Sequence, residues 1–330
     1  MIRMKEYEIT PGNIPEHFTV HGTDKYFRRM PEEIAKTVSS EVLRQSKLPA
    51  GGRIRFRTDS PQIYVRVEFA NRELNNGFEI TSGGRRSGHC PPDGDADFLE
   101  GTFYSEMCGE GKRSCDITVF LPRTVQLKRA VIGIEDGRKL EDAEPYKITA
   151  PIVFYGSSIT MGACVGLPAR TYTALVSEAL GADHLNLGFG GAAKGEPEMA
   201  RYIATLNMSA FVMDYDHNAD TAEYLRETHK PFFDTVRRAQ PDLPILLMSR
   251  PNTDSDFEGS CAARRVILDT FHAALDAGDK HVDFVDGFYL FGNYSRELCI
   301  TEDGCHPSEL GAQRMADTVY PRLKALTERK

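Results

Sequence analysis

The spacing of apolar residues changes in kind near residue 150, and this change limits the possible folds more than any other feature. Before it, apolar positions recur at every second residue, as in the run Ile-Tyr-Val-Arg-Val-Glu-Phe at 63–69, which is typical of half-buried strands. After it, short apolar runs alternate with segments of helical period. A chain of 330 residues is long enough for two ordinary domains. We therefore predict one domain over residues 1–150 and a second over 151–330.

The first half is expected to be an all-β sandwich of the jelly-roll kind. Its short alternating runs are separated by turn-forming residues, and residues 31–43 are its one stretch with helical character. Arg53, Arg55 and Arg57 alternate with apolar residues, so the pattern predicts that they share a solvated sheet face.

The second half is expected to be a three-layer α/β/α domain with a parallel, flavodoxin-like sheet. Strand and helix patterns alternate, which favours a parallel sheet covered on both faces. One of the helices is predicted to begin at Pro231. The predicted strands are 152–155, 184–187, 210–213, 244–248 and 282–285. In such sheets ligands bind beyond the carboxyl ends of the strands, so the residues that follow each strand are the candidates for a site.

Composition excludes several classes of function. The net charge of −8 argues against a nucleic-acid partner, and no apolar run approaches the roughly 20 residues of a membrane span. The seven cysteines are scattered and odd in number, so we expect neither a disulfide framework nor a structural zinc site. The first residues lack the apolar core of a signal peptide. A cytoplasmic location is therefore the expectation.

Polar and glycine residues follow four of the predicted elements. Ser158 follows the first strand, a glycine turn ending at Gly191 follows the second, and Asn218 follows the third. Asp303 and His306 lie in the last loop. The G-x-S-x-G nucleophile elbow and the phosphate-binding loop are absent from the sequence. The spacing of the glycines after the second strand does not match the G-x-G-x-x-G pattern of dinucleotide-binding sites.

These side chains fit acyl transfer. Ser158 can attack a carbonyl if His306 takes its proton, while Asp303, three residues earlier, can orient the imidazole. The resulting oxyanion needs donors, and the N–H groups of Ser158 and Gly191 and the amide of Asn218 can supply them, with Gly190 as the alternative to Gly191. This chemistry requires no cofactor and no metal.

The same residues resemble the SGNH (GDSL-type) esterase and lipase superfamily. The resemblance covers most of residues 151–330 and rests on four blocks: Gly156-Ser157-Ser158-Ile159-Thr160, Asn186 to Gly191, Asp216-His217-Asn218-Ala219 and Asp303-Gly304-Cys305-His306. Ser157 stands where the family usually has Asp. A run at 77–81, Gly-Phe-Glu-Ile-Thr, is similar to the Gly-x-Asp-Leu-Tyr signature of two-domain members with an N-terminal β-sandwich. This subgroup resemblance implies action on acetyl or other short acyl esters of sugars.

Other interpretations stay open. Ser158 can serve as a helix N-cap and Asn218 as a turn residue. Asp214, Asp216 and His217 invite a metal site, which we disfavour because no further ligands are assigned to it. The prediction is a serine esterase of short acyl groups whose substrate is a small-molecule or carbohydrate ester. An acyltransferase using the same triad and a catalytically silent carbohydrate-binding protein are the alternatives, and a homo-oligomer is left open.

Overall fold

A computed structural model describes residues 3–71, 76–93, 96–109, 111 and 113–329. Two compact units are present, and each is described by itself. The first comprises Met1–Met30, Ser46–Pro145 and Leu167–Ala169, and the second Pro31–Gln45, Tyr146–Gly166 and Arg170–Lys330. The helical stretch expected near residue 31 therefore packs with the second unit, although it precedes most of the strands of the first.

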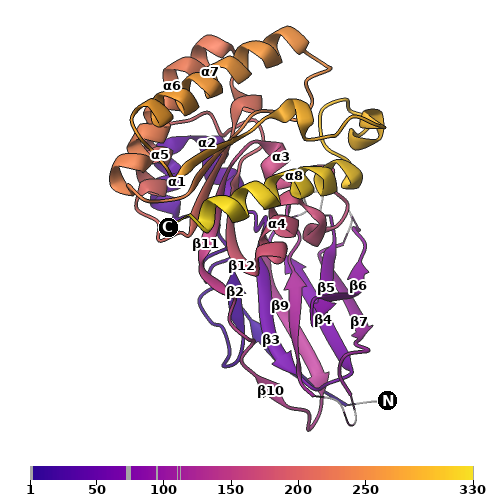
Figure 1. Ribbon diagram of the computed structural model, residues 1–330. Helices are drawn as coiled ribbons and strands as arrows, with labels where there is room; N and C mark the ends of the chain where they lie inside the picture. Colours follow the sequence, from indigo (N-terminus) through magenta and orange to yellow (C-terminus); the bar gives the residue numbers. More distant parts are fainter. Residues whose placement is uncertain (1–2, 72–75, 94–95, 110, 112, 330) are drawn as a thin grey trace. The chain divides into compact units, whose positions relative to one another are not determined.

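The first unit consists of antiparallel sheets, as the alternating pattern predicts. One sheet has the order β1-β9-β4-β7 and the other β10-β3-β8-β5-β6, with β2 paired to β3. Along β4, Ile63, Val65 and Val67 are buried in the core, and the residues between them are more exposed. The strands are β1 Met4–Ile9, β2 Thr19–His21, β3 Arg53–Thr58, β4 Gln62–Phe69, β5 Phe78–Ser82, β6 Arg85–Cys90, β7 Phe98–Tyr104, β8 Cys115–Phe120, β9 Leu127–Glu135 and β10 Leu140–Glu141 (Figure 1).

Two expectations for this unit are wrong in detail. Arg53 and Arg55 of β3 are buried instead of lying on a solvated face. Arg55 is held there by the Glu144 carbonyl oxygen at 2.9 Å and by Asp116 at 3.6 Å, and these partners compensate its burial. The cysteines also differ from expectation, because Cys108 and Cys115 form a disulfide while the other five are free thiols.

The run at 77–81 has, just before β5, a position that only glycine can fill. Gly77 has a φ of +72°, and a Cβ there would lie 2.1 Å from the Cys90 carbonyl oxygen. Two residues on, the buried carboxylate of Glu79 accepts the Ala169 N–H at 3.2 Å and pairs with Arg86 at 3.4 Å. Residues 77–81 thus organise the interior of the first unit.

The second unit contains the predicted parallel sheet. Its order is β12-β11-β13-β14-β15, so the chain starts at β11 and reverses direction across the sheet between β12 and β13. The strands are β11 Ile148–Gly156, β12 Ala182–Gly188, β13 Ala210–Asp214, β14 Ile245–Met248 and β15 Val282–Val285. In this topology the crevice beside the carboxyl end of the first strand is where ligands bind.

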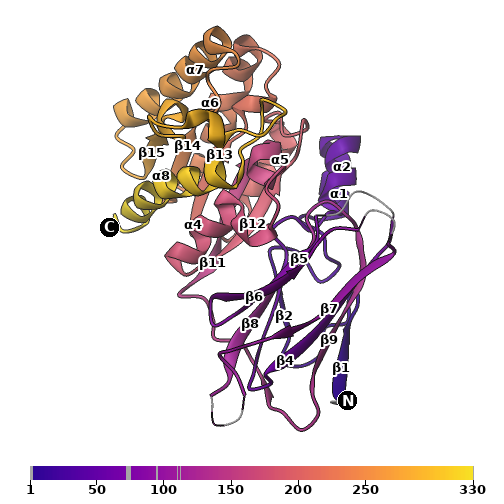
Figure 2. The same cartoon turned by 90° about the vertical axis from the view of Figure 1, so that its right-hand side faces the viewer.

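Helices cover both faces of this sheet (Figure 2). Along β11, Phe154 packs on Tyr172 of α4 in a core shared with α8, while Tyr155 stacks on Phe232 of α6 on the opposite face. The α-helices are α1 Glu32–Val38, α2 Ser40–Ser46, α3 Ser158–Met161, α4 Tyr172–Leu180, α5 Pro197–Ala204, α6 Ala222–Ala239, α7 Phe257–Asp276 and α8 Glu309–Thr327, and the short 3₁₀ segments are η1 Pro168–Arg170, η2 Asp216–Asn218, η3 Gly287–Tyr289 and η4 Arg296–Cys299. The predicted fold class, a β-sandwich and a three-layer α/β/α unit, is confirmed.

Helix α6 begins earlier than its proline suggests. Thr221 caps it by accepting the Tyr224 N–H at 3.1 Å, and Pro231 lies inside the helix instead of at its start. The N-cap therefore sets the boundary more strongly than the proline does. None of the helices in the described ranges combines the length and apolarity needed to cross a bilayer.

Candidate functional site

Ser158 lies at the carboxyl end of β11, as the first residue of the short helix α3. The preceding Gly156 cannot be replaced without a clash, since a Cβ there would lie 2.0 Å from Thr160 Oγ1 and 2.2 Å from the Asp214 carbonyl oxygen. The buried Ser157 caps α3 by accepting the Ile159 N–H at 3.1 Å. This tight turn presents the half-buried Ser158 at the edge of the sheet where the topology places ligands.

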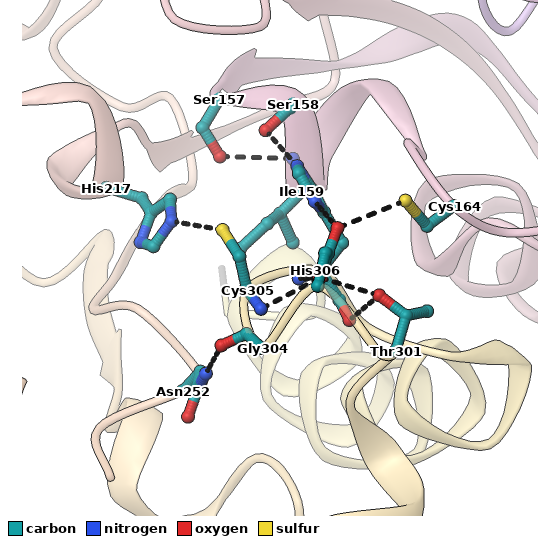
Figure 3. A network of polar contacts seen from close by, with 11 residues as sticks. Ser157, Ser158, Ile159, Cys164, His217, Asn252, Thr301, Gly304, Cys305 and His306 are labelled. Atoms are coloured by element: carbon teal, nitrogen blue, oxygen red, sulfur yellow. Dashed lines mark hydrogen bonds and ion pairs between the residues drawn. The ribbon is translucent and has the colours of Figure 1, made fainter. Parts of the chain in front are cut away.

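Ser158, His306 and Asp303 form a continuous chain of hydrogen bonds. Figure 3 shows Ser158 and His306 side by side. Ser158 Oγ lies 2.7 Å from His306 Nε2, and His306 Nδ1 lies 2.6 Å from Asp303 Oδ2. An ionised carboxylate only accepts, so Nδ1 carries the proton and Nε2 accepts from the serine hydroxyl. The loop before α8 thus brings its Asp/His pair to Ser158, as the sequence predicts.

Asp303 is surrounded by donors. Its Oδ1 accepts Thr301 Oγ1 at 2.7 Å and the backbone N–H groups of Cys305 and His306 at 2.8 and 3.0 Å. Burial alone would raise the pKa of Asp303, but the hydrogen bonds from His306, Thr301 and Cys305 outweigh it and hold that pKa well below its usual range. Asp303 is therefore a fixed negative charge beside the imidazole.

The glycine turn and Asn218 are joined to the nucleophile turn. The Phe189 N–H donates to the Gly156 carbonyl oxygen at 2.8 Å, and Asn218 Nδ2 donates to the Phe189 carbonyl oxygen at 2.9 Å. The amide of Asn218 has a second hydrogen available for a ligand. The N–H of Ser158, in the first turn of α3, has no acceptor within its own helix.

The two candidate glycines differ in their hydrogen bonding. The Gly190 N–H donates to Gln45 Oε1 at 2.8 Å, so it is occupied. Gly191 is exposed and has a φ of +67°, a conformation that glycine adopts without strain. Of the two, Gly191 is therefore the better placed to donate to a ligand.

Asp214 at the end of β13 and Asp216 just after it hydrogen-bond to neighbouring elements. Asp214 Oδ2 accepts Thr160 Oγ1 at 2.9 Å and the Tyr172 hydroxyl at 2.8 Å. Asp216 Oδ2 accepts the Arg250 N–H at 3.0 Å, and the Arg250 side chain donates to the Asp216 carbonyl oxygen at 2.9 Å. These two carboxylates link α3, α4 and the segment after β14 to the end of β13.

Two cysteines also touch the site (Figure 3). Cys164 Sγ donates to Asp303 Oδ2 at 3.5 Å, and Cys305 Sγ lies 3.0 Å from His217 Nε2. Burial raises the pKa of both thiols and lowers that of His217, so both sulfurs stay protonated. Within the described ranges, one group of three side chains has the spacing for a metal ion: Cys164, Asp303 and His306, whose ligand atoms lie within 4.8 Å of one another.

Three contacts of the site were missed by sequence reasoning. Thr301 could have been found, because it precedes Asp303 by two residues in the same loop. Cys164 and Gln45 carry no motif, and their partners lie 139 and 145 residues away in the chain.

A parallel sheet of this order, with a Ser/His/Asp cluster at its carboxyl edge, is the arrangement of the SGNH fold class. Residues 149–324 match the model of the GDSL-like lipase/acylhydrolase family, and residues 11–84 match that of the N-terminus of SGNH-hydrolase-type esterases. The chain therefore belongs to the GDSL-like lipase/acylhydrolase family, as the sequence blocks predicted. No curated protein matches it.

Several solved structures share the fold over the whole chain. A GDSL-like lipase from Bacteroides ovatus superposes with a TM-score of 0.84 at 23% identity, covering 99% of both chains. The salicylyl-acyltransferase SsfX3 of a tetracycline biosynthetic pathway gives 0.79 at 22% identity over 98% of both. The acetyl xylan esterase Est2A from Butyrivibrio proteoclasticus gives 0.63 at 14% identity, also over 98% of both.

Proposed function

We propose that the protein is a serine esterase that removes short acyl groups, acetyl above all, from carbohydrate esters. The observation that carries this proposal is the hydrogen-bonded chain from Ser158 Oγ through His306 to Asp303. A serine hydroxyl aligned with an imidazole, itself oriented by a carboxylate, is the arrangement needed to form and break an acyl-enzyme.

In the proposed mechanism, Ser158 Oγ attacks the ester carbonyl carbon while His306 Nε2 takes the hydroxyl proton. The imidazolium is stabilised by Asp303, whose depressed pKa keeps it negatively charged. His306 then gives the proton to the departing alcohol oxygen, which leaves an acyl group on Ser158. A water molecule, deprotonated by His306, attacks that ester, and the acid leaves as the proton returns to Ser158.

The negative charge that develops on the carbonyl oxygen requires donors fixed in advance. In the proposal these are the N–H groups of Ser158 and Gly191 and the second amide hydrogen of Asn218. All three lie on turns that are linked by the hydrogen bonds of Gly156 and Phe189. Donors held in place in this way need no reorganisation during the reaction, which is why they lower its barrier.

The proposed substrate class rests on the family and on the names of proteins that share the fold. One of these is an acetyl xylan esterase, and its likeness to this chain covers both units. The test is a comparison of kcat/KM for p-nitrophenyl esters of increasing acyl length, for acetylated xylo-oligosaccharides and for phospholipids, with Ser158→Ala as the blank. We expect the acetyl esters to be preferred. A preference for long acyl chains or phospholipids would exclude the short-acyl assignment.

Transfer to an alcohol other than water uses the same first half-reaction. Product analysis with and without an added acceptor alcohol separates the two activities. Free acid as the main product in both cases supports the esterase, whereas an ester of the acceptor formed in preference to free acid would identify an acyltransferase. Tight binding of a glycan without turnover of any ester would identify a carbohydrate-binding protein.

A further inference from the structure

Gln45, from the last turn of α2, contacts the glycine turn through both ends of its side-chain amide. Its Oε1 accepts the Gly190 N–H at 2.8 Å, and its Nε2 donates to the Gly190 carbonyl oxygen, also at 2.8 Å. Nε2 donates in addition to Glu41 Oε1 at 2.7 Å. A carboxylate cannot donate, so Glu41 fixes which end of the Gln45 amide is the NH₂ group.

This pair of hydrogen bonds acts on the peptide that matters for the proposed oxyanion site. The carbonyl oxygen of Gly190 and the N–H of Gly191 belong to one planar trans peptide, and in such a peptide they point in opposite directions. Holding the Gly190 oxygen against Gln45 therefore turns the Gly191 N–H away from Gln45. The other bond occupies the Gly190 N–H, which leaves Gly191 as the donor of this turn.

The turn is closed by the Ala192 N–H, which donates to the Phe189 carbonyl oxygen at 3.1 Å. That bond is compatible with either orientation of the central Gly190–Gly191 peptide, so the bonds of Gln45 select between them. Glycine has access to many backbone conformations, and here two glycines follow one another. The turn also lies against the nucleophile, since a Cβ built on Gly190 would lie 3.3 Å from Ser158 Cβ. Gln45 is 3% exposed, so its hydrogen bonds are shielded from competition with water.

We propose that Gln45 is a positioning residue that sets the direction of the Gly191 N–H and thereby completes the oxyanion site. This inference rests on the proposed esterase function. A residue of α2, which precedes most of the β-sandwich in the sequence, would then contribute to the chemistry of residues 151–330.

The first variant, Gln45→Leu, removes both hydrogen bonds and keeps most of the side-chain volume. Loss of a fixed oxyanion donor typically lowers the rate by about 10²–10³. Because the Gly191 N–H is misdirected instead of deleted, we expect kcat to fall by roughly 10- to 100-fold, with KM changed by less than about 3-fold. The affinity for a boronic acid that mimics the tetrahedral intermediate should fall in parallel with kcat.

A second variant, Gln45→Glu, isolates the bond to the carbonyl oxygen. It is made together with Glu41→Gln and compared with Glu41→Gln alone, because a second carboxylate beside the introduced one would favour its protonated form. The ionised carboxylate can still accept the Gly190 N–H but offers no donor to the Gly190 oxygen. We expect the variant to lose kcat at pH 8 about as strongly as Gln45→Leu. Full kcat in Gln45→Glu would show that the carbonyl bond does not orient the turn, and would overturn the proposal.

The matched control is Val42→Ala, which creates a cavity beside α2 without touching the glycine turn, since Val42 is fully buried in the same helix. It should lower the melting temperature and leave kcat within about 3-fold of the wild type. If Val42→Ala lowers kcat as much as Gln45→Leu at a similar loss of stability, Gln45 acts only through packing. Wild-type kcat in Gln45→Leu would also refute the positioning role, while leaving the esterase proposal intact.

Discussion

The hydroxyl oxygen of Ser158 lies 2.7 Å from Nε2 of His306, although 148 residues separate them in the chain. The first residue of α3 and the loop before α8 bring these atoms together at the carboxyl edge of the parallel sheet. A distance in this range allows proton transfer without further movement of either side chain. The proposed chemistry depends on this contact.

Asp303→Asn tests the orientation of the imidazole. An amide at this position can donate to Nδ1 and so favours the tautomer whose Nε2 carries a proton and cannot accept from Ser158. We expect kcat to fall by roughly 10³–10⁴-fold while the protein stays folded. The exposed neighbour provides the control, since Glu302→Gln should change kcat by less than about 2-fold. Equal activity of the two variants would remove Asp303 from the mechanism.

Asn218→Ala tests the side-chain donor of the proposed oxyanion site. The bond to the substrate oxygen strengthens as charge develops, so its removal should lower kcat by about 10²–10³ and raise KM much less. Loss of the bond to the Phe189 carbonyl oxygen would add to this effect. Labelling of Ser158 by a fluorophosphonate should persist at a lower rate.

His217→Ala is the counterpart of that experiment. We expect a modest effect, because His217 contacts Cys305 and not the proposed oxyanion position. If His217→Ala abolishes activity, Asn218→Ala has little effect and a chelator inhibits, the segment binds a metal and the assignment of Asn218 is wrong.

The buried Asp214 should make the stability of the protein depend on pH. Burial, reinforced by the charge of Asp216, raises the pKa of Asp214 to about 7, against the opposing hydrogen bonds of Tyr172 and Thr160. A raised pKa means that the folded state binds the proton more tightly than the unfolded chain, in which a free aspartate titrates near roughly pH 4. The contribution of Asp214 to the free energy of unfolding is thus fully present below about pH 4. It is lost as the pH rises to about 7, and the loss amounts to at most about 4 kcal/mol.

The measurement is urea unfolding between pH 4 and pH 8 for the wild type and Asp214→Asn. We expect the variant to lose this part of the pH dependence, because asparagine does not ionise. The exposed Asp276→Asn serves as the control and should follow the wild type. Curves for Asp214→Asn and the wild type that stay parallel over the whole range would contradict the raised pKa.

Strand-end residues made much of the site predictable from the sequence. Parallel strands end at one edge, so the sequence alone predicts that Ser158, Gly191 and Asn218 lie close together. The loop that follows the last strand supplied Asp303 and His306, and the family blocks pointed to the same residues. Their catalytic roles stay predictions, and the structure adds their mutual geometry.

Other features depend on tertiary contacts that no local pattern encodes. The burial of Arg55 follows from partners distant in the chain, whereas alternation reports only which residues share a face. Gln45 belongs to no motif, and its contact with Gly190 arises because residues 31–45 pack with the second unit. The Cys108–Cys115 bond joins two cysteines of a scattered set, from which connectivity cannot be deduced.

The most direct test of the account is the identification of the acylated residue. The enzyme is mixed with p-nitrophenyl acetate, quenched in acid during turnover, digested and examined by mass spectrometry. We expect the acetyl group on the peptide that contains Ser158. Ser157→Ala, which loses only the cap of α3, should retain this acetylation. Ser158→Ala should lack it, and its turnover should be reduced by several orders of magnitude. Acetylation of Ser157 instead, or turnover that persists in Ser158→Ala, would contradict the central claim.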